Sequence, residues 1–283
     1  MSRITTPLRR LFLFSLLMVG VVFWLPGCGG GGKKSAPPPP PPVTSNPGYY
    51  DNVSTKGGAH VYQPDNSTLL SIADLQGMVN GSQFTLVSAA NNLAYYATFT
   101  GLSGNTYTAS VAIYKDNIPF GNTTISGTLV AGTNGSLTGT FGTSGTGYGH
   151  GTFSLDYSLA NLRLAAVSRI VRVSGANPID WINNISTTTL SSLQINSVGV
   201  IKESTTAKVG NFTGCKISGS ITAIPTTALY QVTMTLTNCD PTKVISANGN
   251  YAGLATSRTA ATADDRLVVS VTNGVYSMDG EFH

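Results

Sequence analysis

The stretch 93-LAYYATFTGLSGNTYTASVAIY-114 decides the fold, because apolar and polar residues alternate along both of its halves. A period of two places alternate side chains on one face of a β-strand. Folding the chain about Ser103 pairs Phe99 with Tyr107 and Leu93 with Ile113, so every apolar residue meets another. The stretch therefore predicts an antiparallel hairpin with one buried face. The apolar phase consists of Leu93, Tyr95, Ala97 and Phe99, then Tyr107, Ala109, Val111 and Ile113.

Two further hairpins follow from the same test. One has a three-residue loop centred on Asn134, with Gly135 at its left-handed position. The other turns at Asn273-Gly274, a dipeptide that strongly favours a two-residue hairpin turn between alternating strands. The expected pairs are Ala131 with Leu137 and Leu129 with Gly139 in the first hairpin, and Val271 with Tyr276 and Val269 with Met278 in the second.

Helical patterns are scarce in the rest of the chain. Two segments, 67–78 and 176–184, favour a turn or two of helix, with Ser67 as a cap and Pro178 at a first helical position. Each of them precedes a run of strands. Further strands are expected at Gln83–Ser88, Thr152–Tyr157, Leu190–Ile195, Val198–Glu203, Lys216–Thr222, Tyr230–Thr237 and Asn248–Thr256.

The pattern predicts an all-β protein with two antiparallel meander domains, each preceded by a short helical turn. Residues 49–165 would form an N-terminal β domain and residues 166–283 a C-terminal one. Consecutive hairpins indicate antiparallel sheets, which protect their edges by closing into small barrels or two-layer sandwiches. We favour barrels, with one continuous sheet across both halves as the main alternative.

The N-terminus has the pattern of an export signal. Arg3, Arg9 and Arg10 precede the apolar run 11–25, which is shorter than the roughly 20 residues that span a membrane. The run ends in Leu25-Pro26-Gly27-Cys28, which resembles the signal of bacterial lipoproteins. That resemblance implies cleavage of residues 1–27 and lipidation of Cys28. Pro26 departs from the usual small residue; an ordinary signal peptide or an uncleaved anchor is the alternative.

Residues 28–48 are rich in Gly and Pro and cannot bury apolar surface. We expect them to tether the β domains to the membrane. Gly29, rather than Asp, follows the lipid cysteine, and by resemblance to enterobacterial lipoproteins this favours the outer membrane.

The charge balance argues against a nucleic-acid partner. Five of the 16 Lys and Arg residues lie in the first 34 positions, which leaves 11 basic residues against 12 acidic ones in the β domains. No basic patch follows from this balance. Charged residues make up only 10% of the chain, and Gly, Ser, Thr and Asn fill the positions where Lys and Glu usually stand. This composition is typical of exported β-proteins.

Several C-terminal motifs carry a second resemblance. They are GSLTGTFGTSGTGYGHGTFSLDYS from 135, GCKISGSI from 214, YQVTMTLTNC from 230, GNYAGLAT from 249 and DDRLVVSVTNG from 264. Together these motifs, which lie within residues 127–274, resemble a loosely defined group of proteobacterial surface lipoproteins. The resemblance implies an envelope-anchored β fold and no particular activity.

Cys215 and Cys239 remain once the lipid cysteine is set aside, and an exported protein with two cysteines is expected to pair them. They flank one hairpin. In a regular antiparallel hairpin the residue numbers of every pair add to the same sum. The apolar residues of this hairpin face each other only if that sum is odd, whereas 215 and 239 add to an even number. Either a bulge intervenes near Gly214, or Cys239 lies beyond the regular pairing.

Catalytic motifs are missing from the sequence. It has neither the Gly-x-Ser-x-Gly elbow of hydrolases nor a His-Glu-x-x-His zinc motif, and it has only three histidines, His60, His150 and His283. Glu203 and Glu281 lie on distant strands. Three tyrosines, Tyr95, Tyr96 and Tyr107, would either line a binding surface or pack in the core, and packing is favoured for at least two of them.

The sequence thus predicts a lipid-anchored bacterial envelope protein with a non-enzymatic structural or recognition role. It predicts no catalytic residue, no metal and no cofactor, and no ligand-binding residue is identified. The partner would be a protein, a glycan or a small apolar ligand, besides the membrane reached by the lipid. The alternative is an envelope hydrolase acting on a cell-wall or surface polymer, in which His60 or His150 would share a cleft with a carboxylate.

The lipid anchor is tested with radiolabelled palmitate in a bacterial expression host. We expect the wild-type chain to incorporate the label and Cys28→Ala to lose it, because the thioether needs the cysteine sulfur. Label retained by Cys28→Ala, or absent from the wild type, would contradict the anchor.

Overall fold

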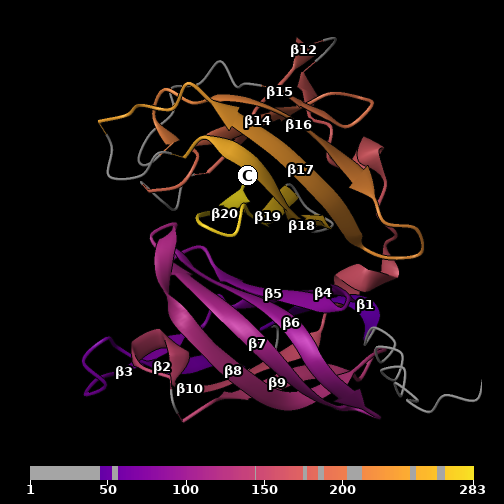
Figure 1. Cartoon of the computed structure of the whole chain (residues 1–283). Helices are drawn as coiled ribbons and strands as arrows, with labels where there is room; N and C mark the ends of the chain where they lie inside the picture. Colours follow the sequence, from indigo (N-terminus) through magenta and orange to yellow (C-terminus); the bar gives the residue numbers. More distant parts are fainter. Residues whose placement is uncertain are drawn as a thin grey trace, which may run out of the picture. The chain divides into compact units, whose positions relative to one another are not determined.

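The computed structural model describes most of the chain beyond the N-terminal segment and contains two separate antiparallel sheets (Figure 1). The signal, Cys28 and nearly all of the tether lie outside the described residues. None of the helices in the described part is long and apolar enough to cross a bilayer. The described residues are 45–52, 57–143, 145–174, 177–183, 188–202, 212–242, 247–259 and 265–283.

Ten strands form the first sheet, in the order β1-β4-β5-β6-β7-β8-β9-β10-β2-β3. Because β10 also pairs with β1, at Tyr50 with Tyr157 and Asp51 with Asp156, eight of the strands close into a barrel. The β2–β3 hairpin extends from the other part of β10. The strands are β1 (Ser45–Asp51), β2 (Gly58–Tyr62), β3 (Leu69–Ile72), β4 (Gln76–Gly81), β5 (Gln83–Ser88), β6 (Leu93–Ser103), β7 (Thr106–Lys115), β8 (Ile118–Val130), β9 (Ser136–Phe141) and β10 (Gly151–Tyr157).

Eight strands form the second sheet, in simple sequence order from β13 to β20. Ile182, at the end of β13, and His283, just after β20, exchange two backbone hydrogen bonds of 3.0 and 2.8 Å, which join the first and last strands. The strands are β13 (Trp181–Ile182), β14 (Ser192–Ile195), β15 (Val200–Lys202), β16 (Lys216–Ala223), β17 (Leu229–Thr237), β18 (Gly249–Thr259), β19 (Asp265–Thr272) and β20 (Ser277–Phe282). A separate two-residue pair joins β11 (Val173–Ser174) to β12 (Asn177–Pro178).

The predicted fold class is confirmed: the protein is all-β, with two antiparallel meanders that close as barrels. Two sheets, rather than one continuous sheet, span the two halves. All of the expected strands are present, and β5 has the predicted bounds.

The two predicted helical segments are wrong, because both contain strands. Residues 67–78 contain β3 and the start of β4, and residues 176–184 contain β12 and β13. The pairing of Ile72 with Ala59 and of Met78 with Tyr49 overrides the local helical spacing of the apolar residues. The helical turns of the described chain are 3-10 turns: η1 (Gly147–Gly149), η2 (Leu159–Leu162) and η3 (Val167–Arg169), of which the last two precede the second barrel.

The predicted hairpin registers differ from the observed ones by two residues. Tyr95 pairs with Ile113 instead of Val111. A β-bulge between Phe99 and Gly101 then shifts the register by one residue, and the chain turns at Gly104, whose φ is +57°. Inward-facing residues still meet inward-facing residues, because a shift of two leaves every side chain on its original face.

The other two predicted hairpins are displaced in the same way. The left-handed glycine of the 131–135 loop is Gly132, with a φ of +97°, and not Gly135. At the last hairpin the loop has four residues, and the Asn273 side-chain oxygen accepts the backbone N–H groups of Val275 and Tyr276 at 2.9 and 2.6 Å. The observed pairs are Leu129 with Leu137 and Gly127 with Gly139, then Thr272 with Ser277 and Val271 with Met278.

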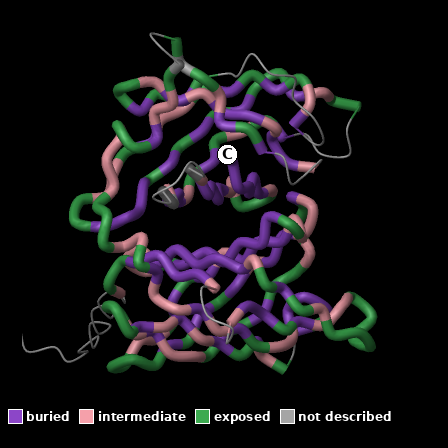
Figure 2. Tube along the Cα trace, turned by 180° about the vertical axis from the view of Figure 1, so that it is seen from behind, coloured by how far each residue is buried: buried purple, intermediate pink, exposed green. Residues whose placement is uncertain are grey.

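Inward side chains of the described strands form a buried apolar core in each barrel. Figure 2 shows the resulting long buried tracts along the strands of both sheets. Trp181 anchors the second core and donates from Nε1 to the Ile170 carbonyl at 2.8 Å. The largest buried side chains of the first core include Tyr50, Phe84, Tyr95, Phe141 and Ile72, and those of the second include Trp181, Phe212, Tyr230, Tyr251 and Phe282.

The predicted disulfide is present between Cys215 and Cys239, whose Cα atoms lie 3.8 Å apart. The β16–β17 register has the odd sum that the apolar residues require, with Ile217 opposite Leu236. Cys239 therefore lies beyond the regular pairing, after Asn238, whose φ is +55°. The second of the two alternatives is correct.

Replacing Cys215 and Cys239 together with Ala should lower the free energy of unfolding by about 3 kcal/mol, because the bond closes a loop with a sequence separation of 24 residues. Urea denaturation of the oxidised wild type and the double variant measures the loss. Equal midpoints, or two free thiols by mass in the wild type, would contradict this expectation.

Candidate functional site

Within the described residues, the three histidines do not converge with a carboxylate as a hydrolase would require. His60 lies on β2 and lines a shallow groove formed mainly by Ser and Thr side chains of β8, β9 and β10. His150 stacks on the Tyr62 ring with centroids 4.8 Å apart. His283 is the histidine that approaches a carboxylate of the described residues, with 3.5 Å between its Nε2 and Glu281 Oε1. Glu203 lies outside the described residues.

Two of the three candidate tyrosines belong to the core. Tyr95 and Tyr107 point into the first barrel, where their hydroxyls donate to the carbonyls of Tyr148 and Thr138, both at 2.9 Å. Tyr96 is on the opposite face of β6 and lies against the second sheet. The prediction that at least two of the three would pack in the core is confirmed.

Outward-facing residues of β4 to β7 contact outward-facing residues of β17 to β20, within the compact unit formed by residues 41–283. A small apolar cluster spans this contact, and all its members lie on the strand face opposite to the barrel cores. It comprises Tyr49, Met78, Val87, Leu229, Leu254 and Val268.

A buried polar cluster beside the apolar one joins Tyr96 to the second sheet. The Tyr96 hydroxyl donates to Asp279 Oδ1 at 2.7 Å. Ser270 Oγ lies 2.5 Å from the same carboxylate oxygen and 2.8 Å from the Tyr96 oxygen. Asp279 is 7% exposed and Ser270 is fully buried. This cluster holds the Tyr96 ring in one orientation.

The buried environment of Asp279 disfavours the ionised form of its carboxyl group. Burial raises the pKa of Asp279 to about 6, and the hydrogen bonds from Ser270 and Tyr96 oppose that rise. Burial also raises the pKa of Tyr96, and the Asp279 charge adds to that rise. The Tyr96 proton is therefore retained at neutral pH and bridges the two sheets.

Glu281 makes a second polar link two residues further along β20. It accepts from Gln76 Nε2 and from Arg266 Nη1, both at 2.8 Å, and Gln76 in turn accepts from the Tyr49 hydroxyl at 2.5 Å. The sequence predicts that Glu281 lies on a strand but does not predict its partners. Its partners lie up to 205 positions away in the sequence.

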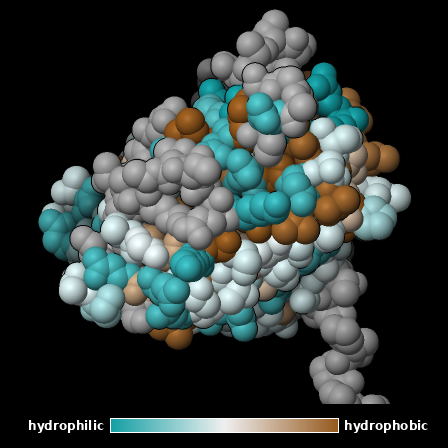
Figure 3. Space-filling view, turned by 90° about the horizontal axis from the view of Figure 1, so that it is seen from above, coloured by the Kyte–Doolittle hydropathy of each residue, from teal (hydrophilic) through white to brown (hydrophobic). Residues whose placement is uncertain are grey.

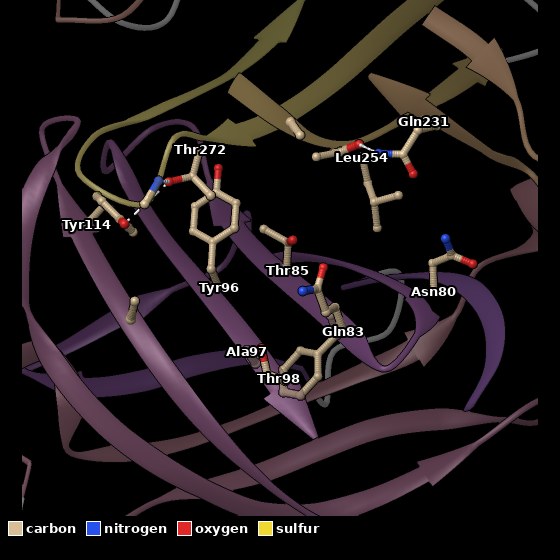
Figure 4. Close-up of a pocket in the computed structure, with 15 residues that line it drawn as sticks. Asn80, Gln83, Thr85, Tyr96, Ala97, Thr98, Tyr114, Gln231, Leu254 and Thr272 are labelled. Atoms are coloured by element: carbon tan, nitrogen blue, oxygen red, sulfur yellow. Dashed lines mark hydrogen bonds between the residues drawn. The ribbon is translucent and has the colours of Figure 1, made fainter. Parts of the chain in front are cut away.

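An open cleft of about 360 Å³ lies beside these contacts and has walls from both sheets (Figure 4). Tyr114 and Thr272 lie at one end, while Asn80 and Gln231 lie at the other, on opposite walls. None of the residues that line the cleft carries a charge. They are Asn80, Gln83, Phe84, Thr85, Tyr96, Ala97, Thr98, Ala112, Tyr114, Gln231, Ala252, Gly253, Leu254, Thr272 and Gly274.

Several polar side chains of the cleft are available to a ligand. Among the residues that the structure describes, no hydrogen bond engages the side chains of Asn80, Gln83, Thr85 or Thr98. Thr85 is 5% exposed as a whole residue and lines the cleft. Gln231 donates from Nε2 to the Gly253 carbonyl at 3.0 Å, which orients its side-chain oxygen.

The sequence alone does not predict the cleft, because most of its residues occupy the polar phase of strands, the phase that ordinarily faces solvent. One signal was available: Met78, Val87, Leu254 and Val268 are apolar residues on that polar phase. Such residues indicate that a second face of the strands is covered.

Metal chemistry finds no support in the described part of the chain, where no group of three or more His, Cys, Asp or Glu side chains converges.

The hydropathy of the face seen in Figure 3 is mixed, with hydrophobic residues in groups among hydrophilic ones. Comparison of the chain with protein-family models, with curated proteins and with solved structures finds no match.

Replacing Asp279 with Asn should change how stability depends on pH. The folded protein keeps a proton on Asp279 up to about pH 6, whereas the unfolded chain releases it near 3.8, so ionisation of this group weakens folding as pH rises through that window. We expect the wild-type free energy of unfolding, relative to Asp279→Asn, to fall by up to about 3 kcal/mol between pH 4 and pH 7.

Urea denaturation of both proteins at unit steps of pH measures this difference. Asn retains an acceptor oxygen for Tyr96, so the variant is a close structural match. Parallel pH profiles would show that Asp279 titrates in the folded state as it does in the unfolded chain.

Proposed function

We propose that this chain is a lipid-anchored bacterial envelope protein with a non-enzymatic recognition role, and that the cleft between its two sheets is the recognition site. The cleft carries this proposal, because it combines a concave, uncharged surface with polar side chains that have no partner in the described chain. Rigid strands supply both walls, and a site built on strands is held more accurately than one on loops.

The anchor and the location rest on the sequence and on the disulfide. A lipidated Cys28 would carry a diacylglycerol thioether and an acylated amine, and two or more chains suffice for stable membrane attachment. The disulfide between Cys215 and Cys239 suits an oxidising compartment outside the cytoplasm. The expected tether, 28–48, would be shortened by β1, which begins at Ser45, and its residues 28–44 would hold the two barrels away from the outer membrane.

The hydrolase alternative would need a carboxylate that reaches a substrate. Asp279 is the carboxylate next to the cleft, and the Tyr96 side chain and Ser270 occupy its Oδ1. Glu281 is held by Gln76 and Arg266. These contacts favour a structural role for both carboxylates, and therefore recognition over hydrolysis.

A variant that fills the cleft tests the recognition site. Ala252 is exposed on β18 and lines the cleft, so Ala252→Trp adds bulk there without removing a contact. We expect the full chain to co-sediment with isolated bacterial envelope polymers, and Ala252→Trp to bind at least tenfold more weakly. Ala131→Trp, at an exposed position of the 131–135 loop, is the matched control and should bind as the wild type does.

Three results would contradict the proposal. They are a wild-type chain that does not co-sediment, equal binding by wild type and Ala252→Trp, and release of soluble fragments with new reducing ends during the incubation. The last result would favour the hydrolase.

A further inference from the structure

We infer that the cleft binds a short segment of a neutral oligosaccharide. This inference rests on the proposed recognition function and names the class of ligand. It follows from three properties of the cleft: its lack of charge, the kind of polar group that it offers, and the closed pairing of the strands around it.

Charge excludes ionic ligands from the cleft. None of its fifteen lining residues is Lys, Arg, Asp, Glu or His. A phosphate, sulfate, carboxylate or ammonium group placed there would lose hydration without gaining an ion partner, which is strongly unfavourable. The nearby carboxylate of Asp279 is already bonded to Tyr96. A neutral ligand is therefore preferred.

The polar groups are those that match sugar hydroxyls. An amide side chain presents a donor and an acceptor side by side, and a Thr hydroxyl can act as either. A sugar hydroxyl has the same dual capacity, so Asn80, Gln83 and Thr98 can each serve one whichever way its proton points. Thr85 adds a hydroxyl that makes no hydrogen bond among the described residues.

The cleft also offers apolar surface of the size that a sugar ring needs. Tyr96 and Leu254 lie on opposite walls of the cleft. Ala112 pairs with Tyr96 across β6 and β7, and Ala252 is two residues before Leu254 on β18. The C–H faces of a pyranose can pack on such surface while its hydroxyls reach the amides. The volume of about 360 Å³ is at the small end of ligand sites, which suits a short segment of a glycan chain.

Strand pairing argues against an extended peptide. Peptides commonly bind by adding a strand to a free sheet edge. Each strand that lines the cleft, β4 to β7 and β17 to β19, already pairs with a neighbour on both sides. The cleft thus offers side chains to a ligand and no backbone edge.

The test presents the full chain, in mild detergent, to an array of neutral oligosaccharides and of matched acidic ones bearing sialic or uronic acids. We expect binding to members of the neutral set. The double variant Asn80→Ala/Gln231→Ala removes an amide from each wall and should weaken that binding about tenfold or more. Asn105→Ala, at the exposed β6–β7 turn, should leave it unchanged. Near-ultraviolet circular dichroism confirms that the variants are folded.

The outcomes separate this inference from the proposed function. Preference for acidic glycans, or neutral binding that survives both the double variant and Ala252→Trp, overturns the inference. If Ala252→Trp abolishes envelope binding while no neutral glycan binds the wild type, the ligand class is wrong and the recognition site stands. If neither the envelope polymers nor any glycan binds, both the inference and the proposed function fail.

Discussion

The backbone hydrogen bonds that join the first and last strands of each meander are the constraint on which the rest of this structure depends. In the first barrel they lie between β1 and β10, and in the second between Ile182 and His283. An antiparallel meander left open would expose two edges that pair readily with other chains. Closure removes those edges and encloses a core within each sheet. Alternate side chains along each strand then point into that core.

The outside of each barrel then has two kinds of surface. Most outward residues are small and hydroxyl-bearing, but some of those on β4 to β7 and on β17 to β20 contact one another. Along β20 every residue is buried, although only alternate ones reach the barrel core. Two carboxylates, Asp279 and Glu281, lie in this contact, and a buried carboxylate is unfavourable unless hydrogen bonds satisfy it. Tyr96, Ser270, Gln76 and Arg266 provide those bonds and so orient the groups next to the cleft.

The low charge of the chain connects its composition with its proposed ligand. Where surface positions carry Thr, Asn and Gln in place of Lys and Glu, a cleft on that surface is uncharged as well. Such a cleft provides no ion partner for a charged ligand, whereas its amides and hydroxyls can form hydrogen bonds with a neutral ligand rich in hydroxyl groups. On the proposed function, the uncharged polar residues of the surface would also supply the recognition chemistry.

The sequence by itself determined which side chains of each strand face inward, and that the two C-terminal cysteines pair. Alternation is a local property with a period of two, so residues 93–99 and 106–114 display it without knowledge of their neighbours. The tertiary structure decided what alternation leaves open. A shift of two residues keeps every face, so Tyr95 could pair with Val111 or Ile113, and only the turn and the bulge after Phe99 selected the second. Residues 67–78 have apolar residues at helical spacing, but β3 pairs with β2 instead. Hydrogen bonds and packing with a partner strand override a local preference for helix. The cleft belongs wholly to the tertiary structure, because Asn80 and Gln231 face each other only when two closed barrels meet.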